Sequence, residues 1–233
     1  MTLITFLIPS RSRIQKLIDC VRNIERQVGD DNELVQIIIR LDLDDKESFR
    51  ILDEKFNIKI KVIIGERGRG YCDLYKYYNE CAYISRGKYL LMWNDDSNFR
   101  DENWLKIFSD ETKRIENEIN IPYSYWFSGT PTTEYFPDGS SRYRDWPCFI
   151  ALNRIVFEKM GFYSLHQQND TFLYHILEPI KYLRKIEDIY VDHIAAIDID
   201  ESNADEVTKE VKQLYNHDFN FGLIKETQNK IIN

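Results

Sequence analysis

The chain has few cysteines, and they are not arranged for a disulfide framework or a metal cluster. Four occur among 233 residues, and none belongs to a C-x-x-C pair. They are Cys20, Cys72, Cys81 and Cys148. Thiols scattered in this way are typical of reduced, mostly buried side chains. The pattern therefore argues against a disulfide frame and against a structural zinc site.

Long apolar runs are also missing. No run approaches the roughly 20 residues that span a bilayer. The first residues, MTLITFLIPSRSR, lack the charged lead and the cleavage site of a signal peptide. We therefore expect a soluble, cytoplasmic protein with no transmembrane segment.

Positive charge is in deficit. The chain has 31 Lys and Arg residues against 39 Asp and Glu residues, a formal net charge of −8. A nucleic-acid or anionic-membrane partner would favour a basic surface, so neither is expected. An anionic substrate would need a local basic patch. The hydrophobic content of 43% is enough for one well-packed core.

Short apolar runs that alternate with amphipathic segments predict an α/β fold. The runs that read as strands cover residues 2–9, 34–41, 58–64 and 88–93. The helices expected between them cover residues 14–24, 48–56 and 73–84, with Gly87 as the stop of the last. Strands that alternate with helices form a mostly parallel sheet covered on both faces. The carboxyl ends of such strands meet at one edge, where ligands bind.

The pattern is more mixed after residue 103. We expect helices at 104–120, 154–160 and 170–177, and strands at 123–128, 147–153 and 187–193. A loop rich in Pro, Thr, Ser, Gly and Tyr covers residues 130–145, and a polar helix is expected near 205–215. Since no repeat, low-complexity tract or linker interrupts the chain, residues 1–233 are predicted to form a single domain.

The segment KYLLMWNDDSNF, residues 88–99, is the most informative in the chain. Its apolar run stops abruptly at Asn94, Asp95, Asp96 and Ser97. Strand alternation would place Asn94 and Asp96 on one face and Asp95 on the other, pointing away. Carboxylates gathered at a strand end are costly without a cation, and a hard divalent ion prefers their oxygens. The alternative is a polar turn that caps the next helix.

Six short motifs, taken in order, resemble the nucleotide-sugar-dependent glycosyltransferases of the GT-A fold, especially the family 2 type. They are FLIPSRSR, IIIRLDLDD, VIIGERGRG, SRGKYLLMWNDDS, CFIALNRIVFEKMGFY and QNDTFLYHI. The similarity covers about residues 3–195. It implies a Rossmann-like sheet flanked by helices, a smaller acceptor-side sheet and a C-terminal helix. Residues 1–100 would then form a nucleotide-binding half, 101–200 an acceptor-binding half and 201–233 a helical tail.

The resemblance implies a divalent metal at the D-x-D element, with one departure. Asn94 stands where the family usually has the first aspartate, so Asp96 becomes the main acidic ligand. A C-terminal histidine completes the coordination in many such enzymes, which suggests His193, with Asp192 as the less favoured choice. A mixed carboxylate and imidazole set favours Mn²⁺ over Mg²⁺. The alternative is that His193 has no ligand role.

The resemblance also implies a catalytic base. Asn169 and Asp170 occupy the place of an acidic pair at a helix start, whose aspartate deprotonates the acceptor hydroxyl. One positioned carboxylate is enough for a single displacement with inversion. We choose Asp170, with Asp145 and Glu134 as alternatives. The competing interpretation is that Asp170 only caps its helix.

Candidate nucleotide contacts follow the first four strands. In the resemblance they include Asn94 and Asp95, together with Pro9, Ser10, Asp42, Gly70 and Asp73, the last of which would contact the base or cap a helix. Arg11, Arg13, Arg67 and Arg69 lie at strand ends in an otherwise acidic chain. Arginine pairs with phosphate or stacks on a base, so we expect at least one to hold the nucleotide. The alternative is that these arginines are solubilising loop charges.

The leading hypothesis is a metal-dependent, inverting glycosyltransferase that moves a sugar from a nucleoside diphosphate donor, with UDP favoured, to a saccharide or lipid-linked hydroxyl. Tyr135, Phe136, Tyr143 and Trp146 in the 130–146 loop are candidates for acceptor contact. A sugar nucleotidyltransferase is the second hypothesis, and a catalytically silent scaffold that binds a saccharide or a protein is the third. We leave a homodimer open.

Overall fold

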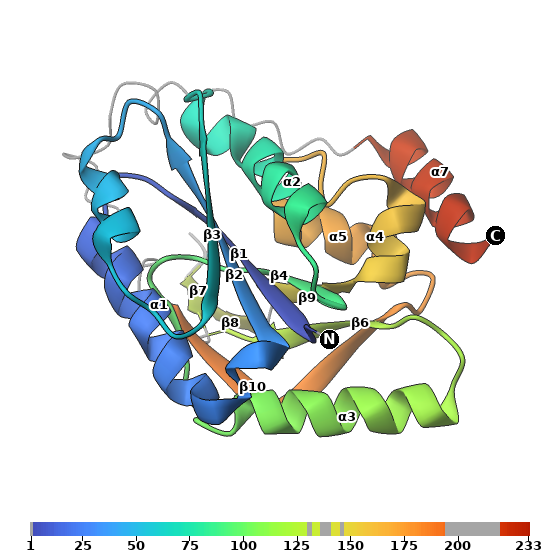
Figure 1. Ribbon diagram of the computed structural model, residues 1–233. Helices are drawn as coiled ribbons and strands as arrows, with labels where there is room; N and C mark the ends of the chain where they lie inside the picture. Colours follow the sequence, from blue (N-terminus) through green and yellow to red (C-terminus); the bar gives the residue numbers. More distant parts are fainter. Residues whose placement is uncertain (1, 130–131, 136–140, 145–146, 194–219) are drawn as a thin grey trace.

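The computed structural model describes residues 2–129, 132–135, 141–144, 147–193 and 220–233 (Figure 1). An eight-stranded sheet runs through it, with the strand order β3-β2-β1-β4-β9-β6-β10-β5. Its strands are β1 (Ile4–Ser10), β2 (Val35–Asp42), β3 (Lys59–Gly65), β4 (Tyr89–Met92), β5 (Ser97–Phe99), β6 (Ser124–Ser128), β9 (Phe149–Asn153) and β10 (Leu183–His193).

Helices cover both faces of the sheet (Figure 1). They are α1 (Ile14–Val28), α2 (Leu74–Ile84), α3 (Trp104–Glu118), α4 (Arg154–Met160), α5 (Asn169–Leu177) and α7 (Phe221–Ile232). Three short 3-10 helices, η1 (Gly29–Leu34), η2 (Glu47–Asp53) and η3 (Gly70–Asp73), lie in the connections. The predicted α/β fold class is thus confirmed.

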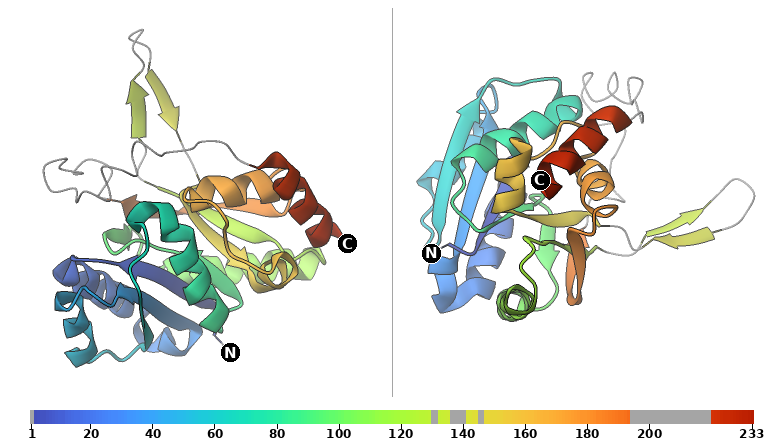
Figure 2. Two further views of the ribbon diagram at one scale, coloured as in Figure 1. Left: turned by 90° about the horizontal axis from the view of Figure 1, so that it is seen from above. Right: turned by 90° about the vertical axis from the view of Figure 1, so that its right-hand side faces the viewer.

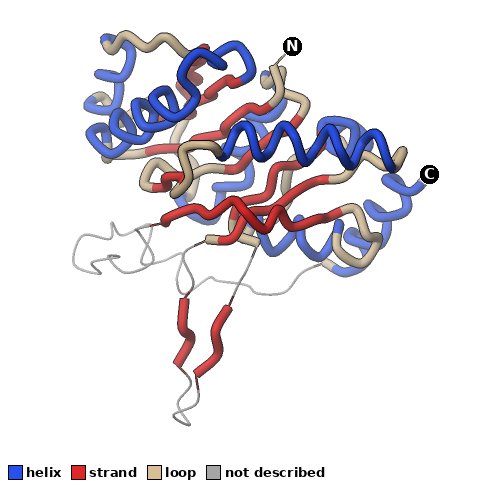
Figure 3. Tube along the Cα trace, turned by 90° about the horizontal axis from the view of Figure 1, so that it is seen from below, coloured by secondary structure: helices blue, strands red, loops and turns tan. Residues whose placement is uncertain are grey.

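The two halves of the sheet differ in strand direction. β3, β2, β1 and β4 are parallel, which is the arrangement that the alternating strands and helices predict. β9 is antiparallel to both β4 and β6, β10 is parallel to β6, and β5 is antiparallel to β10. A separate two-stranded sheet, β7 (Thr132–Tyr135) and β8 (Ser141–Arg144), extends away from the body (Figures 2 and 3).

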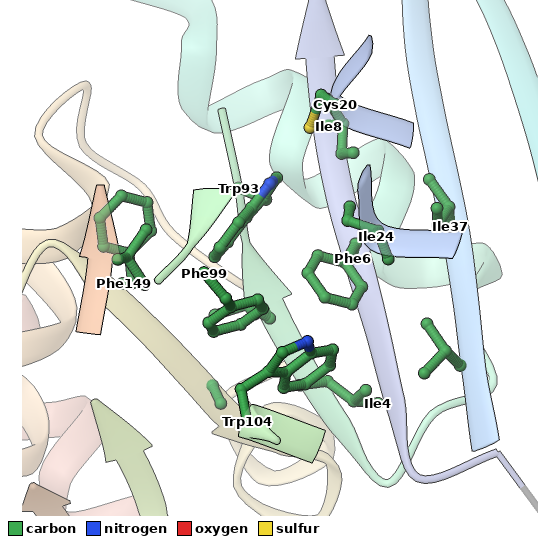
Figure 4. Close-up of a cluster of buried hydrophobic side chains, with 14 of the residues drawn as sticks. Ile4, Phe6, Ile8, Cys20, Ile24, Ile37, Trp93, Phe99, Trp104 and Phe149 are labelled. Atoms are coloured by element: carbon green, nitrogen blue, oxygen red, sulfur yellow. The ribbon is translucent and has the colours of Figure 1, made fainter. Parts of the chain in front are cut away.

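Two apolar cores hold the layers together. The larger lies between the sheet and helices α1 and α3, and it is rich in aromatic rings (Figure 4). Phe99 stacks on Trp104 with ring centroids 4.0 Å apart, and Phe6 meets Trp104 edge-on at 5.6 Å. The second core packs α2, α4, α5 and α7 against the opposite face. Because β1, β2 and β4 are covered on both faces, their sequences are continuously apolar rather than alternating.

Several local expectations were wrong. The short helix expected at 48–56 is the 3-10 helix η2, which ends at Asp53, and part of the predicted 130–145 loop forms the hairpin of β7 and β8. Strand β5 was not among the expected strands. Gly87 does not end α2, which stops at Ile84. A Cβ at Gly87 would lie 2.6 Å from the backbone nitrogen of Thr5, so glycine allows the close approach of this loop to β1.

Two further features agree with the sequence expectations. The four cysteines are free thiols, and Cys20 and Cys81 are buried. Among the described residues, no helix combines the length and apolar character needed to cross a bilayer. The predicted helix near 205–215 lies outside the described residues.

Candidate active site

The carboxyl ends of the parallel strands form one edge of the sheet. Strand β1 ends at Ser10, whose register partner on β2 is Leu41, and Asp42 in turn lies beside Gly65 at the end of β3. A cavity of about 310 Å³ opens at this edge. The sequence-predicted residues that line it are Pro9, Ser10, Arg11, Arg13, Asp42, Arg67, Gly70 and Asn94. The fold therefore brings together most of the predicted nucleotide contacts.

Asp42 is buried at the base of this cavity between two arginines. Its Oδ2 accepts a hydrogen bond from Arg11 at 2.9 Å, and its Oδ1 accepts one from Arg40. Arg40 is 2% exposed, and its guanidinium carbon lies 4.0 Å from the centre of the Tyr77 ring. The guanidinium also pairs with Glu80 at 3.0 Å. The cavity is thus lined by arginines whose charges are balanced by neighbouring carboxylates, since Arg11 also pairs with Asp44.

Sequence reasoning missed Arg40. The signal was a single charged residue inside the apolar run IIIRL, two positions before Asp42. Residues two apart on a strand share a face, so Arg40 and Asp42 point to the same side of β2. A lone arginine within a buried strand requires a buried partner, and Asp42 supplies it.

Asp95 and Asp96 follow β4 and line a separate cavity of about 550 Å³, next to residues of α1. One arginine, Arg13, contacts both carboxylates. The Nη2 of Arg13 lies 2.5 Å from Oδ1 of Asp95, and its Nη1 lies 2.9 Å from Oδ2 of Asp96. Ser10 donates a hydrogen bond to Oδ2 of Asp95 at 2.5 Å. Burial raises the pKa of Asp95, while Arg13 and Ser10 act in the opposite direction.

The expectation that Asp95 and Asp96 lie on opposite faces was wrong. Strand β4 ends at Met92, so the alternation of a strand does not continue through Asn94–Asp96. Both carboxylates therefore reach Arg13, although they are adjacent in the chain. Asn94 differs from them: its amide oxygen accepts a hydrogen bond from the Tyr78 hydroxyl at 3.3 Å, and it lines the cavity at the strand ends.

The chemistry of these side chains fits a hard divalent cation. Two buried carboxylates already share a positive charge, and an amide oxygen lies next to them in the chain. His193 ends β10 and is the register partner of Ser97, one residue beyond Asp96. The side chain of His193 is not among those that the structure describes. Among the described residues, no three Asp, Glu, His or Cys side chains form a group that could hold a metal ion. Asp192, the alternative ligand, pairs with Arg100 at 2.5 Å.

Asp73 organises the loop between β3 and α2 and does not line the cavity. Its carboxylate accepts a hydrogen bond from the Arg69 backbone at 2.8 Å and pairs with the side chains of Arg69 and Lys76. Although burial raises the pKa of Asp73, these contacts lower it to about 2. A Cβ at Gly68 would lie 2.6 Å from Oδ2 of Asp73, which explains the glycine there. Neither Asp73 nor Arg69 lines the cavity at the strand ends.

Asp73 makes stability depend on acid pH. Because its pKa is lower in the folded chain, the stabilisation is present above pH 4 and is lost as pH falls toward 2. The paired Arg69 and Lys76 side chains are 68% and 51% exposed, so screening limits the effect to about 1 kcal/mol. We expect Asp73→Asn to lower the urea-unfolding free energy by this amount at pH 7 and by less at pH 2.5. An equal loss at both pH values would contradict the assignment.

A second cavity, of about 230 Å³, adjoins the first. The two cavities share the lining residues Tyr71, Leu74, Tyr78 and Asn94. Asp170 lines the second cavity from the first turn of α5, where its carboxylate accepts a hydrogen bond from the Thr171 backbone at 2.7 Å. Gln168 is the N-cap of α5, so Asp170 is not the capping residue. The fold thus places Asp170 on a cavity continuous with the strand-end residues.

The alternatives for the base and the acceptor contacts cannot be placed at the level of side chains. Asp145, Phe136 and Trp146 lie outside the described residues. Glu134 lies on β7, and only its backbone is described there. The same holds for Tyr135 and Tyr143, which lie on β7 and β8. These expectations stay predictions.

No protein-family model and no curated protein sequence matches this chain. Solved structures do. The chain matches S. aureus TarS 1-349 with a TM-score of 0.59 and 14% identity, over 100% of this chain and 71% of that one. A structure of the same TarS fragment in complex with UDP-GlcNAc gives a TM-score of 0.58 and 15% identity, over 100% and 72% of the two chains.

Two other solved structures share the architecture. The mannosyltransferase PcManGT from Pyrobaculum calidifontis, in complex with GDP-Man and Mn²⁺, matches with a TM-score of 0.59 and 10% identity. The match covers 82% of this chain and 56% of that one. The 4-diphosphocytidyl-2C-methyl-D-erythritol synthase from Anaerococcus prevotii matches with a TM-score of 0.52 and 12% identity, over 80% and 87%. The chain therefore has the GT-A fold, as its sequence motifs predicted.

Proposed function

We propose that this protein is a glycosyltransferase that transfers a sugar from a nucleoside diphosphate donor to a hydroxyl acceptor with inversion. The observation that supports this most strongly is the pair of adjoining cavities. One is lined by the arginines and polar side chains at the strand ends, and the other is lined by Asp170. Because the two cavities share four lining residues, Asn94 among them, a diphosphate in the first would present its sugar toward the second.

The first cavity suits a nucleoside diphosphate. Arg11, Arg13 and Arg67 line it together with Ser10, and guanidinium groups pair with phosphate oxygens. Tyr71, which is exposed and lines the cavity, supplies an aromatic face for a base or ribose. We favour a UDP-linked donor because the resemblance in the sequence implies it, and a solved structure with this fold was obtained with UDP-GlcNAc.

In the proposed reaction, Asp170 accepts the proton of the acceptor hydroxyl as its oxygen attacks the anomeric carbon. The new glycosidic bond forms while the bond between the anomeric carbon and the diphosphate oxygen breaks, and the nucleoside diphosphate leaves. Arg11 and Arg67 would stabilise the charge that develops on the leaving diphosphate. Attack from the side opposite the leaving group inverts the anomeric centre.

Asp95, Asp96, Asn94 and His193 are the residues that we propose to hold a divalent metal, with Mn²⁺ preferred. When bound, the metal would neutralise the charge of the diphosphate leaving group. The carboxylates bring hard oxygen ligands, and an imidazole would shift the preference from Mg²⁺ toward Mn²⁺. The mannosyltransferase with this fold was solved with Mn²⁺ and GDP-Man.

A sugar nucleotidyltransferase is the second candidate. The structural match to the 4-diphosphocytidyl-2C-methyl-D-erythritol synthase favours it, since that protein is a nucleotidyltransferase. The loop after β1, Arg11–Ser12–Arg13, lacks the glycines that this class usually carries after its first strand. The two reactions are distinguished by their products, which are a nucleoside diphosphate for sugar transfer and pyrophosphate for nucleotidyl transfer.

A thermal-shift screen tests the donor site. UDP, GDP and CDP are each added to the full chain with and without Mn²⁺. A ligand at about 100 times its Kd contributes about 2.7 kcal/mol, which for a chain of this size raises the Tm by about 5 °C or more. We expect UDP with Mn²⁺ to give the largest shift. If no nucleoside diphosphate raises the Tm, the proposed function is wrong.

Two variants locate the binding in the first cavity. Arg67→Gln removes a guanidinium that lines it and should reduce the UDP shift by at least half. Arg114→Gln is the matched control, because Arg114 lies on α3 and pairs there with Glu111 and Glu118. The control should keep the full UDP shift. Equal shifts in the two variants would place the nucleotide elsewhere.

A further inference from the structure

We propose that Arg13 occupies the position of the cation at the Asp95–Asp96 pair and has to leave it before a divalent metal binds. The arginine would then act as a built-in competitor of the metal. This inference rests on the proposed function for the use of the metal, but its test needs no nucleotide and no turnover.

The ion pair is a built feature of the fold. The side chains of Asp95 and Asp96 are 0% and 3% exposed, so both are removed from water. Each arm of the Arg13 fork contacts a different carboxylate, at 2.5 and 2.9 Å. The planar fork of an arginine can contact two adjacent carboxylates at once, which the single ammonium of a lysine does less well. Oδ1 of both aspartates is buried without a hydrogen bond of standard geometry among the described residues. A metal that binds the same oxygens therefore competes with the guanidinium directly.

The backbone before Arg13 is held in an uncommon conformation. Ser12 has a φ of +55°, in the left-handed region that residues other than glycine seldom adopt. Its backbone N–H donates to Oδ2 of the buried Asp45 at 2.7 Å, and Ser48 donates to the same oxygen at 2.5 Å. Strain of this kind persists only where neighbouring groups impose it. Asp45 thus fixes the loop that directs Arg13 toward the carboxylates.

Arg13 also has a place to go. Its side chain is 41% exposed, and it lines the cavity at the strand ends that we assign to the diphosphate. In the ligand-free protein the guanidinium neutralises the carboxylates. Once a metal neutralises them, the guanidinium is available to the phosphates in the same cavity. Metal and nucleotide would then each favour the binding of the other, because both favour the state in which Arg13 has left.

The test is a titration of the full chain with Mn²⁺ alone, followed by the electron paramagnetic resonance signal of free Mn²⁺. We expect Arg13→Gln to bind Mn²⁺ about tenfold more tightly than the unchanged protein, a difference of about 1.4 kcal/mol. Arg22→Gln is the matched control: Arg22 lies on α1 and pairs with Glu54, so its Mn²⁺ affinity should not change. Equal or weaker Mn²⁺ binding by Arg13→Gln would overturn the inference.

A second variant guards against loss of folding. If Arg13→Gln lowers the Tm too far for titration, Arg13→Lys keeps the charge but loses the fork. All three proteins are then titrated in the same stabilising osmolyte. Arg13→Lys should bind Mn²⁺ more tightly than the unchanged protein and less tightly than Arg13→Gln. Absence of Mn²⁺ binding in every variant would overturn the inference, whereas a UDP shift without metal would leave the donor site of the proposed function intact.

Discussion

Replacing Asp170 by asparagine is expected to lower the turnover of sugar transfer about a thousandfold while leaving the Kd for the nucleoside diphosphate unchanged. General base catalysis contributes roughly 10²- to 10⁴-fold, and an amide cannot accept the acceptor proton. The substitution keeps the shape of the side chain and an oxygen that accepts the Thr171 hydrogen bond. Product formation by mass spectrometry gives turnover, and thermal shift with UDP gives donor binding.

The control for this variant lies on the same helix. Glu178→Gln makes the same change from carboxylate to amide at the other end of α5, where Glu178 is exposed. Its turnover should stay within about twofold of the unchanged protein. Intact transfer by Asp170→Asn would remove Asp170 from the mechanism and leave Glu134 and Asp145 as the candidates. An equal loss in both variants would indicate a structural effect on α5.

Replacing Arg40 by methionine is expected to lower the free energy of unfolding by about 3 to 5 kcal/mol, which is the usual cost of breaking a buried ion pair from one side. Arg40 is 2% exposed and contacts Asp42, Glu80 and the ring of Tyr77. Without it, the buried Asp42 keeps only Arg11, whose side chain is 30% exposed. Urea unfolding followed by circular dichroism measures the loss.

Two further variants separate the effect of the buried charge from the effect of lost packing. Arg114→Met removes an arginine with two exposed ion pairs on α3 and should cost no more than about 1 kcal/mol. In the double variant Arg40→Met with Asp42→Asn, the orphaned carboxylate is gone, so part of the loss should be recovered. If Arg40→Met lowers the free energy of unfolding no more than Arg114→Met does, the buried Arg40–Asp42 ion pair does not stabilise the fold as proposed.

The first half of the fold could be predicted from the sequence because its signals are local. Apolar runs of four to eight residues, each followed by polar turn residues, indicate buried parallel strands. Strand direction in the second half could not be predicted in this way. The pairing of β9 between β4 and β6 depends on contacts between residues far apart in the chain. Nothing in the composition of residues 149–153 distinguishes an antiparallel strand from a parallel one.

The site was predictable as a set of residues and less so as a geometry. Strand ends bring Ser10, Asp42 and Asn94 to one cavity, which follows from the parallel sheet. The position of Asp95 was predicted wrongly because strand alternation was extended past Met92 into a turn. The ion-pair partners of the arginines could not be predicted either, since Arg13 and Asp96 are 83 residues apart in the chain. Only the folded chain shows that one guanidinium serves both carboxylates.

The most direct measurement of the central claim is product analysis of the full chain with Mn²⁺, UDP- or GDP-linked sugars and a mixture of saccharide acceptors. The account predicts release of the nucleoside diphosphate together with a lengthened saccharide, and loss of both products in Asp170→Asn. Formation of pyrophosphate from a nucleoside triphosphate and a sugar phosphate, without any transfer from nucleotide sugars, would contradict it.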